Sequence, residues 1–354
     1  MNNNEYRINA LPAKTWYQLN MNDTRLLWDD NLVPCNMDTK GCDKVCSDVN
    51  AKDYSDIENA VLTGAGKEAD VLFEAGVTNT LLVNADKETN GQTLYINVNG
   101  NDKNQSGKII VNVEDNVTFT IIENFKGESS TGRVALRTLI DTGLNSKVRL
   151  IQVYMQPESI DVLSDTGCRL SDNASFEIVQ VFVGRGSLYD GIRTELIGNN
   201  SAFTADIGYL GAKKQNIDIN LISNHIGKKT NSGIRVDGAL KDEASKLFRG
   251  SIDFKNGSSG SVGAETENVL LLGEDVRNKT IPLILCAEED VNGSHGATIG
   301  EIDEETLFYY ASRGIDKKNA EDIMTKGRIE VIIRKINDED TEKLAEEQLE
   351  EVLQ

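Results

Sequence analysis

The stretch IPLILCAEEDVNGSHGATIG, residues 281–300, decides the fold together with its continuation to Gly327. It holds an apolar strand pattern, then a turn of small residues around a histidine, and then two short helical patterns. Residues before it alternate between apolar and polar as β-strands do, whereas residues after it recur at helical spacing. The stretch therefore marks the junction between a β-rich body and a helical end.

The body, from about residue 78 to 285, is a succession of strand patterns with almost no helical periodicity between them. Alternation predicts strands with one buried face, and clusters of Gly, Asn, Asp and Ser separate them. So many strands exceed a single sandwich, so we expect one continuous parallel β-helix over roughly residues 80–290. No strict repeat is visible, and a pair of sandwiches is the alternative. The clearest patterns are residues 93–99, 108–114, 117–122, 148–154, 176–183 and 217–222.

This pattern divides the chain into an N-terminal region (1–77), a β-helix core (78–300) and a C-terminal helical region (301–354). The N-terminal region has one helical pattern, near residues 56–62. The apolar run Val71–Glu74 is expected to begin the sheet.

The C-terminal region contains residues that typically start and end short helices. Asp303 and Asp316 are placed as N-caps, and Gly314 suits the left-handed position that ends a helix. Residues 328–336 fit either a last strand or a helix. The acidic tail, residues 337–354, keeps an amphipathic helical stripe.

Charge and cysteine usage exclude several classes of function. The chain carries 37 basic and 57 acidic side chains, a net charge of −20, which disfavours nucleic acid and anionic membranes as partners. No apolar run approaches the roughly 20 residues that span a bilayer, and no signal segment opens the sequence. Five cysteines, an odd number, indicate free thiols. We therefore expect a soluble, cytoplasmic protein.

Cys286 and His295 are the candidate chemical residues of the junction. Thiolate and imidazole are ligands for iron and zinc, and they also form nucleophile–base pairs. The alternative is a buried structural cysteine and a turn histidine bonded to backbone. His225, the other histidine of the chain, is expected in a turn. No catalytic triad spacing, P-loop or dinucleotide motif is present.

Cys35, Cys42 and Cys46 form a second group of possible ligands. Their spacing of seven and then four does not fit a zinc knuckle, and no histidine lies nearby. We expect reduced thiols in a mobile N-terminal region, with no role assigned.

The junction resembles the SufB/SufD family of iron–sulfur cluster assembly proteins, and its SufD branch in particular. The resemblance is dense over about sixty residues, and residues 9–16 are also similar. Its residues are Asn268–Leu272, Pro282–Leu285, Ser294–Gly300, Asp303–Glu305, Leu307–Tyr309, Ser312–Ile315 and Ala320.

The resemblance implies a right-handed parallel β-helix between an N-terminal region and a C-terminal helical domain. It also implies that SufB and SufD pair through the β-helix, that C-terminal helices dock the ATPase SufC, and that a cysteine desulfurase supplies sulfur indirectly. The residues expected to meet the ATPase are Leu307, Phe308, Tyr310, Arg313, Ile315, Ile323 and Met324.

Within this resemblance His295 falls on the SufD histidine implicated in cluster assembly at the subunit interface. Cys286 stands where SufB carries its interface cysteine, and Gly296 replaces the SufB glutamate beside the histidine. Because SufB-like and SufD-like features occur together, self-pairing of this chain is a second possibility. Ile281–Leu285 is apolar on successive positions, so we expect it to be buried on both faces, with a partner's edge as cover.

The expected function is a non-catalytic scaffold subunit that pairs with a SufB-like chain and docks a SufC-like ATPase. It would hold no cofactor stably, although a transient iron–sulfur cluster would form on it. One alternative is a self-pairing minimal scaffold. Another, of a different class, is a carbohydrate-active β-helix enzyme such as a lyase or hydrolase, which would require secretion and paired acids in a groove.

Overall fold

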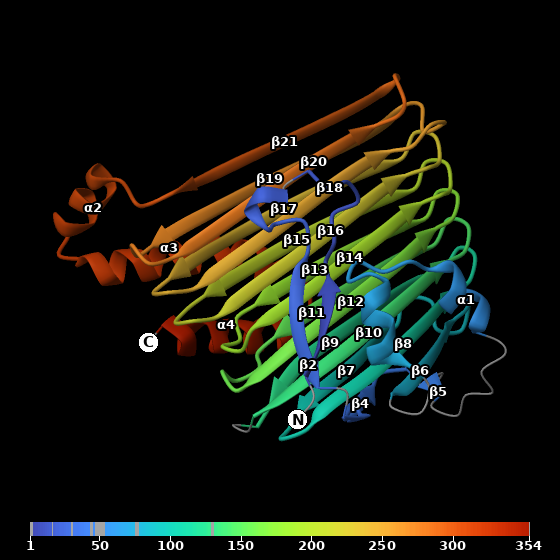
Figure 1. The fold of residues 1–354 in the computed structure, drawn as a ribbon, viewed down its shortest axis with the longest axis horizontal. Helices are drawn as coiled ribbons and strands as arrows, with labels where there is room; N and C mark the ends of the chain where they lie inside the picture. Colours follow the sequence, from blue (N-terminus) through green and yellow to red (C-terminus); the bar gives the residue numbers. More distant parts are fainter. Residues whose placement is uncertain are drawn as a thin grey trace.

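The core of the molecule is a parallel β-solenoid of about eight turns, each of which adds one strand to each of two facing sheets (Figure 1). The computed structural model describes residues 3–15, 17–29, 31–42, 45–46, 54–74, 78–128 and 131–353. The first sheet contains β6 (Asn79–Ala85), β8 (Asn104–Val113), β10 (Gly132–Thr142), β12 (Ile160–Leu170), β14 (Leu188–Leu196), β16 (Asn216–His225), β18 (Ser245–Phe254) and β20 (Arg277–Cys286). The second contains β7 (Thr93–Gly100), β9 (Thr118–Gly127), β11 (Lys147–Tyr154), β13 (Ser175–Phe182), β15 (Ala202–Gly211), β17 (Asn231–Lys241), β19 (Ser261–Leu272) and β21 (Val291–Gly300).

The sheets confirm the predicted parallel β-helix and rule out a pair of antiparallel sandwiches. Neighbouring turns pair in parallel along their whole length, and partner residues lie 26 positions apart at Val162 and Leu188 but 32 apart at Ser245 and Arg277. This variation in turn length explains why no strict repeat is visible in the sequence.

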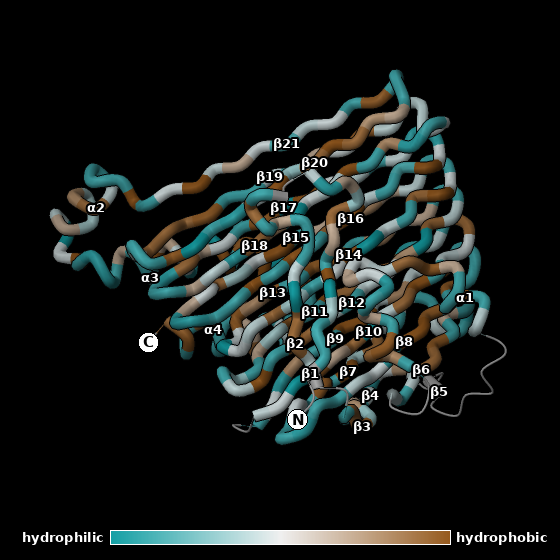
Figure 2. The backbone as a smooth tube through the Cα atoms, viewed as in Figure 1, coloured by the Kyte–Doolittle hydropathy of each residue, from teal (hydrophilic) through white to brown (hydrophobic). Residues whose placement is uncertain are grey.

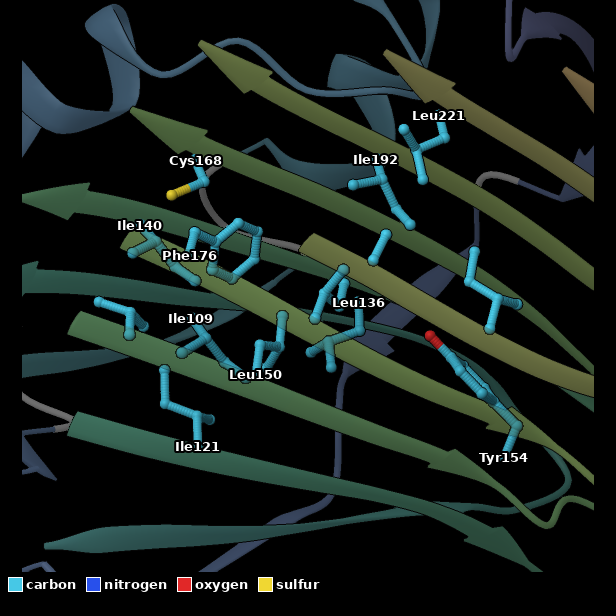
Figure 3. Close-up of a cluster of buried hydrophobic side chains, with 14 of the residues drawn as sticks. Ile109, Ile121, Leu136, Ile140, Leu150, Tyr154, Cys168, Phe176, Ile192 and Leu221 are labelled. Atoms are coloured by element: carbon cyan, nitrogen blue, oxygen red, sulfur yellow. The ribbon is translucent and has the colours of Figure 1, made fainter. Parts of the chain in front are cut away.

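Alternate residues of each strand point into the solenoid and form one continuous apolar core. Figure 3 shows Ile121, Leu150 and Phe176 from the second sheet facing Leu136 and Ile192 from the first. Each fully buried side chain of this kind contributes about 1.5–3 kcal/mol. Hydrophobic and hydrophilic residues alternate along the strands (Figure 2), as the period-two pattern predicts.

One corner of the solenoid is held by a ladder of asparagines. Asn116, Asn145, Asn173 and Asn200 all adopt left-handed φ angles, between 56° and 62°, which asparagine tolerates better than most residues. Each of the last three donates its side-chain amide to the side-chain oxygen of the one before, at 3.1 Å. The ladder therefore stacks successive turns at this corner.

Most of the N-terminal region lies against the first sheet or extends it, whereas one of its strands, Met37–Lys40, extends the second sheet. Its elements are β1 (Asn3–Ile8), η1 (Tyr17–Leu19), β2 (Thr24–Asp29), β3 (Leu32–Pro34), β4 (Met37–Lys40), β5 (Val45–Cys46), α1 (Ser55–Ala60) and η2 (Lys67–Phe73). The expectation that Val71–Glu74 begins the sheet is wrong, because Leu72 and Phe73 end a 3-10 helix whose apolar side packs on the sheet. A run as short as Val71–Glu74 fits a strand and a helical turn equally well.

A buried arginine fixes this region to the solenoid. Arg249 of β18 is fully buried, and its guanidinium donates to the Met21 carbonyl, the Thr24 hydroxyl and the Asp218 carboxylate, each at 2.8 Å. Asp218 also accepts from the Asn9 side chain at 2.7 Å. The N-terminal hairpin is thus tied to two neighbouring strands of the first sheet.

The C-terminal helices are α2 (Glu304–Ala311), α3 (Lys317–Ile333) and α4 (Glu339–Leu353). The predicted N-caps are confirmed, because Asp303 and Asp316 accept backbone N–H groups of Thr306 and Asn319. Gly314 has φ 78°, as predicted. Residues 328–336 are mostly helical, since their β-branched side chains pack on the outer face of the second sheet. None of the helices in the described ranges combines the length and apolarity needed to cross a membrane.

Candidate functional site

The last turn of the solenoid, β20 with β21, is called the open end here, because each strand terminates its sheet (Figure 1). Within the described residues the outer edges of both strands pair with nothing. β21 bears no charged side chain and is exposed along almost its whole length. A long uncharged edge of this kind is a template for pairing with another chain.

Strand register places both candidate residues on the inward-facing side of the open end. His295 pairs with Glu265 and Cys286 pairs with Phe254, and side chains of paired residues point to the same face. Both residues are exposed, because no further turn covers them. The alternative of a buried structural Cys286 is therefore wrong.

The two side chains share this surface without touching. Gly293 lies against Ile284 across the solenoid, and this pair stands between Cys286 and His295 along their strands. The Cys286 thiol donates to the Glu288 carbonyl at 3.1 Å. Among the residues that the structure describes, no three His, Cys, Asp or Glu side chains form a metal-binding group. The open end thus offers separate ligands and no complete metal site.

The apolar run of β20 is covered in a way that the sequence did not indicate. Ile281 is buried against Leu11 and Met21 of the N-terminal region, while Ile284 packs toward the core. The rest of Pro282–Leu285 is half-buried. The chain's own N-terminal segment therefore covers the outer face at Ile281, and cover of the strand edge by a partner stays a prediction.

A charged cluster lies directly beneath the open end, on inward positions of the turn below. The Lys246 ammonium pairs with the Glu267 carboxylate, and both side chains are almost fully buried. Thr280 of β20 accepts from Lys246 at 3.1 Å and donates to Glu267 at 2.7 Å. Burial, reinforced by the charge of Glu267, raises the pKa of Glu265 to about 8 despite the nearby ammonium of Lys246. One cation therefore serves two buried carboxyl groups.

Sequence reasoning missed Lys246, Glu265 and Glu267. Their positions in the alternating strand pattern could have indicated them, because Glu265 and Glu267 stand at inward positions of a strand. Charges at such positions are almost never buried unless they are paired.

His225 does not lie in a turn, which corrects the prediction for it. It ends β16, is fully buried, and hydrogen-bonds the Thr230 hydroxyl through Nδ1 at 2.7 Å and the Ser232 hydroxyl through Nε2 at 2.8 Å. Burial lowers the pKa of His225 to about 4, so this ring is neutral and structural.

The N-terminal cysteines are also placed differently from the prediction. Cys35 and Cys42 are buried in the solenoid core and not in a mobile segment. Burial raises the pKa of Cys35 to about 12, so its thiol stays protonated. The side chain of Cys46 lies outside the described residues.

Exposed apolar side chains occur on the two helices that follow the open end along the chain. Phe308 is 74% exposed and Tyr309 is 53% exposed, and α2 buries none of its side chains. Arg313 stacks on the Tyr309 ring at 3.7 Å. On α3, Ile323 and Val331 are exposed. We call Phe308, Tyr309, Ile323 and Val331 the helical patch.

The other residues expected to meet an ATPase are less accessible. Leu307, Tyr310 and Ile315 are half-buried, and Met324 packs against the second sheet. The apolar stripe of α4, which includes Ala345 and Leu349, is buried in a cluster with α3 and the outer face of the second sheet. Tyr309 and Val331 were missed, because helical periodicity alone cannot tell which face the solenoid covers.

Comparison with known proteins gives one consistent result. The family model described as "SUF system FeS cluster assembly, SufBD core domain" matches residues 95–328. The iron–sulfur cluster assembly protein SufD of Bacillus subtilis is 24% identical over 263 residues, which cover 73% of this chain and 60% of that protein. SufD of Escherichia coli is 25% identical over 206 residues, 58% of this chain and 49% of that protein. A SufBD family protein of Pyrococcus horikoshii is 28% identical over 193 residues, 54% and 43% respectively. The matches thus span about half the length of these relatives.

Proposed function

This chain belongs to the SufBD core-domain family of the SUF iron–sulfur cluster assembly system, and from that premise we propose that it is a non-catalytic scaffold subunit. The cluster is its cargo, assembled at the open end. One observation carries the proposal: an exposed thiol and an exposed imidazole lie on the inward side of the last turn, flanked by two free strand edges.

The partner at the open end is a second solenoid of the same family, in the first place a SufB-like chain. Two open ends that meet would pair their free edges and bury Cys286 and His295 between them. Thiolate sulfur and imidazole nitrogen are both ligands for iron–sulfur clusters, and a two-chain site would supply the further ligands that this chain lacks.

A second copy of this chain is the alternative partner, because Cys286 and His295 occur together on one chain. Hydrogen exchange of β20 and β21 tests the pairing, with the chain alone and with an equimolar SufB-like chain. We expect new protection in both edge strands and none in β4, which caps the opposite end. Protection in the chain alone, with a dimeric mass by light scattering, would favour self-pairing. No protection in any mixture would contradict the proposal.

The helical patch is the proposed docking surface for a SufC-like ATPase. Exposed aromatic rings are typical anchors of protein interfaces, and Phe308 has the most exposed side chain among the large apolar residues described. α4 would present only its acidic outer face to this partner, since its apolar stripe is already buried.

Phe308→Ser tests the docking surface by calorimetry with the ATPase. Deleting residues 303–354 would be a poor test, because it would strip the outer face of the second sheet. We expect Phe308→Ser to weaken binding by about 2 kcal/mol or more, the range of interface hot spots. Leu27→Ser is the matched control, since Leu27 is 54% exposed on the N-terminal hairpin. Equal binding by both variants would contradict the assignment.

A further inference from the structure

Glu265 is a buried carboxyl group that makes no hydrogen bond within the part of the chain that the structure describes. Its exposed fraction is 3%. The ammonium of Lys246 is already engaged by Glu267 and Thr280. A buried polar group without a hydrogen-bond partner costs stability and calls for a specific explanation.

Strand register places this carboxyl group inside the solenoid, one turn below the open end. Glu265 lies directly below His295 in the strand register, on the same inward face. Its carboxylate reaches across the solenoid to Gly250, where a Cβ would overlap it. Gly250 lies below Pro282 of the last turn. The carboxyl group therefore rests on the floor of the open end, with His295 above it.

Adjacent strands are about 4.8 Å apart, so the β-carbons of Glu265 and His295 are separated by about that distance. Residues i and i+4 of a helix are separated by a similar ~5–6 Å, and two histidines at that spacing hold one metal ion in HExxH sites. A carboxylate and an imidazole at this spacing are thus able to reach the same ion.

We propose that the Glu265 carboxylate and the His295 imidazole form this chain's half of a site for a divalent transition-metal ion, iron(II) when the scaffold is at work. Carboxylate oxygen and imidazole nitrogen both bind such ions, and water or the partner subunit completes the coordination. The ion would add positive charge beside Glu265, because the Lys246 ammonium already pairs with Glu267. This assignment rests on the proposed function and adds a ligand that lies a full turn below the exposed surface.

Cobalt(II) alone is a suitable probe, because its visible absorption reports nitrogen and oxygen ligands directly. The experiment uses the full chain in a Cys286→Ala background, so that thiolate absorption at the open end does not contribute. Glu265→Gln and His295→Ala are compared with Glu289→Gln, which changes an exposed acid in the neighbouring loop. Thermal unfolding without metal checks that each variant is folded.

We expect Glu265→Gln and His295→Ala each to weaken cobalt binding by more than about tenfold, since even groups that only support a ligand are worth about 10- to 100-fold. Glu289→Gln should bind normally, and Glu265→Asp, which keeps a carboxylate, should bind better than Glu265→Gln. Normal cobalt binding by Glu265→Gln overturns the inference.

The two proposals fail differently. If His295→Ala abolishes cobalt binding and cluster loading while Glu265→Gln changes neither, the scaffold proposal stands and the Glu265 assignment falls. If neither variant changes cobalt binding or cluster loading, both fall.

Discussion

Replacing Lys246 by methionine tests whether charge pairing holds the floor of the open end. The side chains of Lys246 and Glu267 are 0% and 1% exposed, and Thr280 bridges them. Methionine fills most of the volume but removes the ammonium with which the buried Glu267 pairs. Breaking a buried pair in this way costs about 3–5 kcal/mol. At about 1.4 kcal/mol per factor of ten, local opening should become roughly two to four powers of ten more frequent.

Amide hydrogen exchange in β18 and β19 measures this loss, because a long repeat array need not unfold in one step. The double variant Lys246→Met/Glu267→Leu removes both charges and should recover most of the protection, since apolar replacement of a buried pair is often neutral or stabilising. Equal loss in the single and double variants would refute the reasoning, because it would assign the cost to packing and not to a stranded charge.

Three further predictions concern the fold. Asn145→Ala should lower the free energy of unfolding in urea by about 1–2 kcal/mol. Alanine tolerates the left-handed φ of 56° less well than asparagine does, and two hydrogen bonds of the ladder are lost. A loss no larger than that of an exposed-loop variant would contradict this. Glu123→Gln should reduce the pH dependence of stability. Burial raises the pKa of Glu123 to about 7, above its unfolded value of about 4.3. The free energy of unfolding of the wild type therefore falls as pH rises between these two values, by at most about 1.4 kcal/mol per pH unit. Part of the slope should remain, because burial also raises the pKa of Asp190 to about 7; an unchanged slope would argue against titration of Glu123. Arg249→Met should free the N-terminal hairpin, and limited proteolysis between residues 9 and 24 should accelerate; an unchanged rate would show that Arg249 does not clamp it.

Much of the architecture was predictable because strand alternation is a local property. The length of each solenoid turn was not, although the ladder asparagines carry the signal: Asn116, Asn145, Asn173 and Asn200 are 29, 28 and 27 positions apart. Turns that vary in length leave no fixed period, so only the shared left-handed corner reveals the repeat.

The candidate site was predictable by residue type and only partly by position. Cys286 and His295 stand out as rare residues at the junction, whereas their separation by Ile284 and Gly293 depends on how the two last strands face each other. Glu265 is 30 positions from His295, and only strand register brings the two together. A polar residue at a strand end, such as His225, looks like a turn residue unless its buried hydroxyl partners are known.

Loading of the reconstituted complex with iron and sulfide tests the central claim most directly. The chain is combined with its SufB-like partner and the ATPase, and the cluster absorption of wild type is compared with that of His295→Ala and Cys286→Ala. The account predicts that both variants pair normally, because both side chains are exposed, and that both lose cluster loading. Wild-type loading by both variants would contradict it and leave the open end a purely structural interface.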